Sequence, residues 1–152
     1  MQFLEQQIYM VENLLSYRTR VDSRELSSML AYAERNLDAL ELTLNGNVIL
    51  NICEIIAEDN RKIFGVELLF PVDKTFESRG QCIYKPLFKL ENAVSSRFYG
   101  SFSMMPEFEK QVYSYIEQHH LQPITDVYYV IQQDTSTDIS FDAYVGINNN
   151  VL

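Results

Sequence analysis

The stretch that decides the fold is FYGSFSMMPEFEKQVYSYIEQHHLQP, residues 98–123. It begins with an aromatic segment, and Pro106 follows at a place where the first turn of a helix tolerates proline. Apolar side chains then recur at helical spacing from Phe108 to Ile116, and the pattern ends before Pro123. The stretch therefore predicts the end of a strand, one amphipathic helix and an exit into the next strand.

Extended segments flank this helix on both sides. Residues 84–100 before it are extended in character, and residues 124–132 after it form a β-branched and aromatic run. Residues 134–138 are predicted to be a polar turn, and residues 139–147 alternate apolar with polar side chains. The second half of the chain is therefore predicted to have the order β-α-β-β.

The first half predicts the same order of elements. Residues 8–21 alternate with period two, which is typical of a half-buried strand, and residues 23–41 show helical spacing. After a turn, residues 48–56 are rich in β-branched side chains, and residues 62–72 form a further strand. Alternation in that last strand should place Glu67 on the face opposite its apolar neighbours.

Together the two halves predict one α+β domain covering residues 1–152. The repeats run over about 8–73 and about 83–148, a spacing of roughly 75 to 80 residues. Because half a chain of this size cannot bury both faces of a small sheet, the halves should pair about a pseudo-twofold axis into one antiparallel arrangement. We expect two main helices on one face of the sheet and a cleft between the halves, where ligand pockets tend to form.

Net charge limits the partners of the protein. The chain carries a net charge of −9, and no local cluster of Lys and Arg offsets it, so we expect no binding to nucleic acid. No apolar run approaches the roughly 20 residues of a membrane-spanning helix. Glu5 and Glu12 lie where a signal peptide is basic or apolar. The sequence therefore predicts a cytoplasmic protein that does not contact membranes.

Reactive side chains are few and scattered. Cys53 and Cys82 lie outside any CxxC pair, which predicts free thiols in a reducing compartment. His119 and His120 are adjacent and cannot bind one metal from the same face of a helix, so we expect neither metal nor cofactor. The sequence contains no P-loop, dinucleotide-binding or Gly-x-Ser-x-Gly motif. We expect a protein that is not an enzyme, with a cleft hydrolase as the alternative.

The stretch 98–123 resembles the GyrI-like family, also called the bacterial effector-binding domain family. In that family a strand ending in His-x-Gly-x-Tyr leads into a helix with a Leu-x-x-Trp-Ile core and a Leu-x-Pro exit. Residues 67–72 are similar to the Glu-x-x-x-Pro-Val that closes the family's first repeat. The positions that match the spacing of the second repeat are Gly100, Phe102, Val112, Tyr115, Ile116, Leu121 and Pro123.

The resemblance implies two tandem β-α-β-β units whose cleft holds amphipathic or cationic small molecules, commonly as the sensor half of a transcription regulator. The sequence shows no helix-turn-helix segment, so a stand-alone effector-binding module is expected. The alternative is a protein-interaction role on the same scaffold, for which the negative charge favours a basic partner. The sequence is also compatible with a homodimer.

Acidic and aromatic side chains near the expected cleft are the candidate ligand-binding residues, because a desolvated carboxylate and ring faces both attract cations. The family places an acid two residues before an aromatic on the strand after the second helix. Asp126 occupies this position in one register, whereas a slip by one residue places Val127 there. Glu54, inside an apolar run, is expected to face solvent or else the cleft. The candidates are Glu67, Tyr99, Asp126, Tyr128 and Tyr144.

Overall fold

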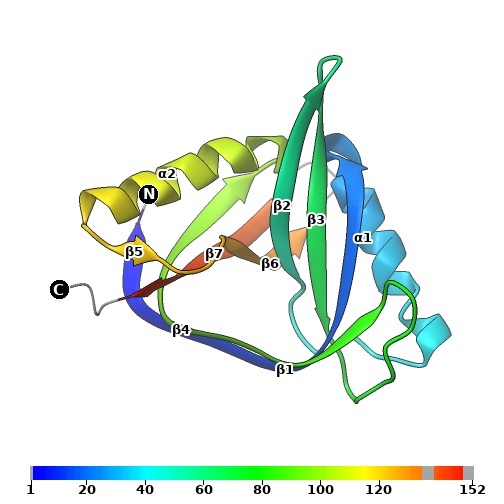
Figure 1. Cartoon of the computed structure of the whole chain (residues 1–152). Helices are drawn as coiled ribbons and strands as arrows, with labels where there is room; N and C mark the ends of the chain where they lie inside the picture. Colours follow the sequence, from blue (N-terminus) through cyan, green and yellow to red (C-terminus); the bar gives the residue numbers. More distant parts are fainter. Residues whose placement is uncertain (1, 135–138, 149–152) are drawn as a thin grey trace.

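Figure 1 shows the computed structural model of the chain, which describes residues 2–134 and 139–148. Its first half contains β1 (Phe3–Asp22), the short 3-10 helix η1 (Ser23–Glu25), α1 (Leu26–Arg35), a second 3-10 helix η2 (Asp38–Leu40), β2 (Ile49–Glu58) and β3 (Arg61–Pro71). Its second half contains β4 (Ile83–Gly100), η3 (Phe102–Met104), α2 (Met105–Gln118), β5 (Gln122–Pro123), β6 (Tyr128–Asp134) and β7 (Ile139–Asn148). The predicted α+β class is confirmed.

The strands form one closed antiparallel sheet. Its order is β4-β1-β3-β2-β6-β7, and β4 also pairs with β7, which closes the sheet. The short β5 adds to the end of β7. The long strands β1 and β4 pair with each other and sweep together below the other strands in Figure 1.

Strand pairing follows the same rule in both halves. The last strand of each half pairs with the other two, β3 with β1 and β2, and β7 with β4 and β6. The halves then meet through equivalent strands, β1 with β4 and β2 with β6. The register agrees as well, because Ser16 opposite Ile83 corresponds to Ser95 opposite Leu4. Exchanging the halves therefore leaves the pattern of pairing unchanged, as a twofold arrangement requires.

Both helices pack on one face of the sheet, which we call the helix face. Leu26 and Leu30 of α1 and Phe108, Val112 and Ile116 of α2 belong to a single core. Their spacing of three or four residues places them on one side of each helix. Alternate side chains of β3 enter the same core, namely Phe64, Val66, Leu68 and Phe70. The expected placement of both helices on one face is confirmed.

The opposite face of the sheet, which we call the aromatic face, has a smaller core of its own. It is built from the buried side chains of Leu14, Ile49, Leu69 and Val130, with Tyr9, Val11, Phe88, Tyr128 and Tyr144 packed against them. Successive side chains of a strand point to opposite faces of the sheet. Adjacent apolar residues such as Leu14 and Leu15 therefore belong to different cores.

The first helical segment is shorter than the predicted residues 23–41. The α-helix ends at Arg35, a 3-10 turn follows, and Glu41 adopts a left-handed φ of 58°. Leu37 and Leu42 still enter the helix-face core, so the apolar spacing continues although the helix does not. Apolar periodicity alone does not separate an α-helix from a tighter 3-10 turn.

Within the described part of the chain, no helix is both long and apolar enough to cross a bilayer.

The first strand begins earlier than the predicted residue 8. Its early part pairs with β4 through register shifts near Gln7, and a β-bulge of this kind interrupts the alternation on which the prediction relied. Asn13 has a φ of 58°, and the side chains facing the aromatic face change there from Tyr9 and Val11 to Leu14.

The strand after α2 begins later than the predicted residue 124. Residues 122–123 form β5 instead, and β6 starts at Tyr128. Ile124 donates its backbone N–H to the carbonyl of Gly146 at 2.8 Å, so the predicted run starts beside β7, and only its later residues belong to β6. The turn predicted at 134–138 falls on the end of β6 and then outside the described residues.

Candidate functional site

Five strands place polar and aromatic residues in one lateral row on the aromatic face. Arg18 of β1 lies opposite Glu67 of β3, which lies opposite Asn51 of β2. Asn51 is opposite Tyr128 of β6, which is opposite Tyr144 of β7. Direct cross-strand partners share a face and lie about 5 Å apart. Glu67, Tyr128 and Tyr144, three of the predicted site residues, therefore belong to one row.

This row lies at a mouth of the closed sheet. Pairing of β1 with β4 ends at Ser16 opposite Ile83, and pairing of β2 with β6 ends at Asn51 opposite Tyr128. Beyond these pairs β1, β3 and β2 continue as a three-stranded extension. The extension lies on one side of the row, and the core of the aromatic face lies on the other.

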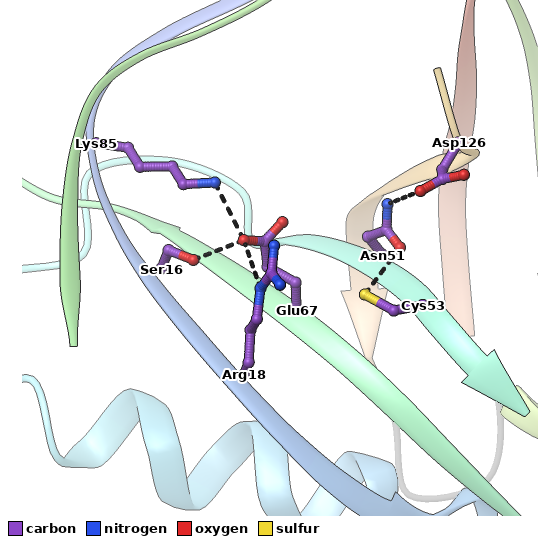
Figure 2. Close-up of polar contacts among 7 residues, drawn as sticks. All are labelled: Ser16, Arg18, Asn51, Cys53, Glu67, Lys85 and Asp126. Carbon is purple, nitrogen blue, oxygen red and sulfur yellow. Dashed lines mark hydrogen bonds and ion pairs between the residues drawn. The ribbon is translucent and has the colours of Figure 1, made fainter. Parts of the chain in front are cut away.

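Glu67 is the buried acid of the row, with only 5% of the residue exposed. Its Oε2 accepts hydrogen bonds from Ser16 Oγ at 2.8 Å, Lys85 Nζ at 3.1 Å and Arg18 Nε at 3.4 Å. Figure 2 shows these side chains converging on Glu67 from β1 and β4. A buried carboxylate is costly without partners, and this set of donors offsets that cost.

The environment keeps Glu67 ionised. Burial is the strongest single influence and raises its pKa, but the hydrogen bonds from Ser16 and Lys85 and the charges of Lys85 and Arg18 act in the opposite direction. The pKa of Glu67 therefore lies below its ordinary value of 4.5. At neutral pH the site holds one carboxylate and two basic side chains in direct contact.

A cavity of about 360 Å³ opens beside this cluster. It is lined by Ser16, Arg18, Glu67, Gln81, Ile83 and Lys85. Strand register places apolar side chains of the aromatic face directly next to it, because Leu14 is opposite Lys85 and Leu69 is opposite Ser16. Leu14 and Leu69 are themselves fully buried, so the apolar surface at the cavity is that of the exposed Ile83 and of the half-buried rings of the aromatic face.

Four aromatic rings in contact form the centre of the aromatic face. The ring centroid of Tyr9 lies 5.1 Å from that of Tyr144 and 6.3 Å from that of Phe88, and Phe88 lies 4.8 Å from Tyr128. Because Tyr128 and Tyr144 are cross-strand partners, the rings form a continuous set from four strands. Burial raises the pKa of each of the three tyrosines, so their hydroxyls are protonated at neutral pH and able to donate hydrogen bonds.

Of the two predicted registers, the structure has the one in which Asp126, and not Val127, lies beside the row. Val127 is buried in the helix-face core, so its neighbours Asp126 and Tyr128 turn away from that core. Asn51 Nδ2 donates a hydrogen bond to Asp126 Oδ2 at 3.5 Å, and Figure 2 shows Asp126 beyond Asn51 from Glu67. The exposed Asp126 lines a separate and more open cavity of about 490 Å³, with Tyr113, Pro123, Ile124, Thr125 and Tyr128.

Two further acidic or aromatic positions lie outside the row. Tyr99 is 70% exposed near the end of β4, opposite Ser140 and away from the partners of Tyr144. The structure therefore does not bring it together with the other four candidates. Glu54 is exposed and forms an ion pair with Arg20 at 3.2 Å, so it faces solvent, which was the preferred expectation.

Sequence reasoning missed Ser16, Arg18, Lys85 and Asn51. The alternation of Arg18 with apolar residues indicated only that its side chain leaves the helix face. A usable signal was the carboxylate of Glu67 within an apolar strand, because a buried acid requires a basic or hydroxyl partner. The identity of that partner depends on which distant strands pair, and local sequence does not specify this.

Within residues 2–134 and 139–148, no set of three His, Cys, Asp or Glu is arranged to hold a metal ion. Both cysteines are free, and Cys53 Sγ lies 3.4 Å from Asn51 Oδ1. Burial raises the pKa of Cys53, so its thiol is protonated at neutral pH and weakly nucleophilic.

Comparison with known proteins identifies the fold. No family model and no curated protein sequence matches this chain. Its structure is similar to EcmrR in a complex with DNA, with a TM-score of 0.66 and 11% identity over 96% of this chain. It is also similar to the isolated EcmrR C-terminal domain, with a TM-score of 0.59 and 13% identity over 97% of this chain and 99% of that one.

A third similar structure is an uncharacterized conserved protein from Listeria innocua, with a TM-score of 0.53 and 11% identity over 95% of this chain and 93% of that one. At these identities the similarity shows the fold alone. The chain spans 57% of the EcmrR molecule in the DNA complex. It is therefore an α+β protein with the fold of the EcmrR C-terminal domain.

Proposed function

We propose that the chain is an effector-binding module of the GyrI-like kind, which holds a small amphipathic molecule at the mouth of the closed sheet. The observation that carries the proposal is the Glu67 cluster, a buried carboxylate that accepts hydrogen bonds from Ser16, Lys85 and Arg18 beside a cavity. Titratable groups with perturbed pKa values beside a cavity are typical of binding sites. The fold shared with the EcmrR C-terminal domain also supports it.

The amphipathic character of the ligand follows from the two surfaces that meet at the cavity. Polar and charged groups surround Glu67, whereas the exposed Ile83 and the four half-buried rings supply apolar surface on the aromatic face. A polar head in the cavity places an apolar tail against this surface, where burial of each CH₂ contributes about 0.8 kcal/mol. The protonated hydroxyls of Tyr128 and Tyr144 supply additional donors along the same path.

The geometry favours binding over catalysis. A cleft hydrolase requires a general acid whose pKa is raised towards neutrality, whereas the pKa of Glu67 is lowered. We therefore propose that the ligand leaves the site chemically unchanged. Hydrolysis of a panel of simple esters with a rate that depends on Glu67 contradicts this part of the proposal.

Thermal denaturation in the presence of a compound panel tests the binding function. Amphipathic molecules of either charge should include some that raise the Tm, because a ligand present at about 100 times its Kd stabilises by about 2.7 kcal/mol. Tyr144→Leu should reduce the shift, since Tyr144 belongs to the row. Tyr99→Leu, at an exposed position outside it, is the matched control. A panel without any stabilising compound, or hits indifferent to Tyr144→Leu, argues against the proposal.

A second candidate function is protein interaction, favoured by exposed apolar side chains on the β1–β4 pair. Ile8 is 71% exposed and Met10 is 55% exposed, and Leu87 of β4 is exposed close to them. Glu12 and Glu91 are exposed on the same strands, which suits a partner with an apolar patch bordered by basic residues. Pull-down from native lysate should recover one stoichiometric basic protein with the wild type and lose it with Met10→Glu. Equal recovery by both contradicts this candidate.

A further inference from the structure

The two halves of the chain contain equivalent Arg–acid pairs that differ in how many hydrogen bonds they form. Arg18 lies opposite Glu67 between β1 and β3, and Arg97 lies opposite Asp142 between β4 and β7. Each arginine follows a buried serine by two residues, Ser16 in the first half and Ser95 in the second. The twofold arrangement of the sheet therefore supplies an internal comparison for the Glu67 site.

In the second half the arginine and the acid form two hydrogen bonds with each other. Arg97 donates from Nε to Asp142 Oδ1 at 2.8 Å and from Nη2 to Oδ2 at 3.1 Å. This bidentate geometry neutralises the carboxylate and fixes the guanidinium plane. Gln132 donates a further hydrogen bond to Oδ2 at 3.2 Å, so the acid has more donors than the arginine alone provides.

In the first half the arginine contacts the acid through one nitrogen, and a second basic side chain shares that acid. Arg18 contacts Glu67 through Nε alone, at 3.4 Å, and Lys85 brings a second positive charge to the same carboxylate oxygen. The position equivalent to Lys85 in the other half is opposite Ala93 and is occupied by the uncharged Gln7. Among the residues that the structure describes, the terminal nitrogens of Arg18 have no hydrogen-bond partner, and Lys85 Nζ has none besides Glu67.

The cavity consequently has a net charge of +1 within a chain of net charge −9. A cationic ligand in this cavity meets two positive side chains, and one oxygen of the Glu67 carboxylate, Oε2, already accepts three hydrogen bonds. An anionic group meets unused N–H donors, including the planar end of an arginine that suits a carboxylate or phosphate. Two further acids lie near the cluster on this face: Glu54, opposite Gly65 and already ion-paired with Arg20 at 3.2 Å, and Asp126, which accepts a hydrogen bond from Asn51.

We infer that the cavity at the sheet mouth receives the anionic head group of an amphipathic ligand, held by Arg18 and Lys85, with Glu67 as the positioning residue that orients both. This inference rests on the proposed binding function and names the class of its ligand. Ser16 belongs to the same arrangement, because its hydroxyl fixes the carboxylate that holds the two basic side chains.

Three probes with the same apolar chain and different heads test the charge of the ligand. Octanoate, 1-octanol and octyltrimethylammonium are titrated into the wild-type protein by calorimetry. Octanoate should bind about tenfold or more tightly than octanol, as expected for charge-assisted hydrogen bonds, and the ammonium compound should bind most weakly. Tighter binding of octyltrimethylammonium than of octanoate overturns the inference and leaves the binding function standing.

Matched variants locate the effect. Arg18→Met should weaken octanoate binding about tenfold, whereas Arg97→Met, at the equivalent position of the other half, should leave it unchanged. Lys85→Met should also weaken it, in contrast to Lys89→Met on the same strand, whose partner is the exposed Glu91. Lys85→Arg keeps the charge and should retain binding. Circular dichroism establishes that each variant is folded. Because the Arg18 side chain is mostly exposed, Arg18→Met is the substitution least able to disturb the fold.

The outcomes separate this inference from the proposed function. Equal weakening by Arg18→Met and Arg97→Met overturns the inference, because the effect is then not that of the cavity. Hits from the compound panel that are displaced by none of the octyl probes overturn the anionic class but not the binding function. Failure of both the panel and the probes removes both.

Discussion

Lys85→Met should destabilise the protein by an amount that depends on pH. The substitution removes the Nζ that donates to Glu67 Oε2 at 3.1 Å, while Ser16 and Arg18 remain as partners. Breaking a fully buried ion pair costs about 3 to 5 kcal/mol. Because the Lys85 side chain is 40% exposed and solvent screens it, we expect a loss of about 1 to 2 kcal/mol at pH 7.

The sign of the pH dependence follows from the lowered pKa of Glu67. In the wild type the ionised carboxylate stabilises the fold above its unfolded pKa, near 4.5, and this contribution is lost as the pH falls through the lower, folded pKa. In the variant, burial is opposed by fewer partners and the pKa of Glu67 rises. The difference in stability between wild type and variant should therefore be largest at neutral pH and shrink as the carboxylate protonates.

Urea denaturation at a series of pH values measures this difference directly. Lys89→Met is the control, because it removes an exposed lysine of the same strand from an exposed ion pair and should change stability little. If the two variants lose the same stability, or if the loss in Lys85→Met is independent of pH, the Glu67 network does not contribute in the way described.

Three further substitutions test the packing around the two faces of the sheet. Phe108→Ala should cost about 3 to 5 kcal/mol of unfolding free energy, because its buried ring packs against Phe98 and Phe141; a loss below about 1 kcal/mol in urea denaturation speaks against this core. Gly100→Ala places a Cβ 2.7 Å from Phe98 Cζ and should lower stability by about 1 to 3 kcal/mol, visible as a lower Tm than that of the wild type. Tyr129→Phe removes a buried hydroxyl that interacts with the Glu109 carboxyl without a hydrogen bond of regular geometry, so the free energy of unfolding should change by less than about 1 kcal/mol, and a larger loss means that the two groups are fully hydrogen-bonded in solution.

The sequence predicted the elements of this fold better than their ends. Apolar periodicity located both helices, and alternation assigned Phe64 and Glu67 to opposite faces of β3, because these patterns record directly which side of an element is buried. The first residues of β1 escaped prediction because a register shift near Gln7 interrupts alternation. The early end of α1 escaped because Leu37 keeps the helical spacing after the helix has ended.

The candidate site was predictable where it depended on residue type and unpredictable where it depended on pairing. Glu67, Tyr128 and Tyr144 were chosen as an acid and aromatics near the seam of the halves, and the register brings them into one row. Arg18 and Lys85 reach Glu67 from strands distant in sequence. Glu67 was predicted as an acid for a cationic or amphipathic ligand, whereas contacts across three strands give its carboxylate basic partners within the chain.

The agreement in register between the two seams has a consequence for the origin of the molecule. A single β-α-β-β unit exposes two strand edges, and in this chain each edge pairs with its own counterpart. Self-complementary edges of this kind are what two identical subunits need to assemble isologously. An ancestral unit of half the length could therefore have built the same closed sheet as a dimer of identical chains. In the present chain one arginine–acid pair is held by two hydrogen bonds, while the acid of the other pair has an additional lysine partner.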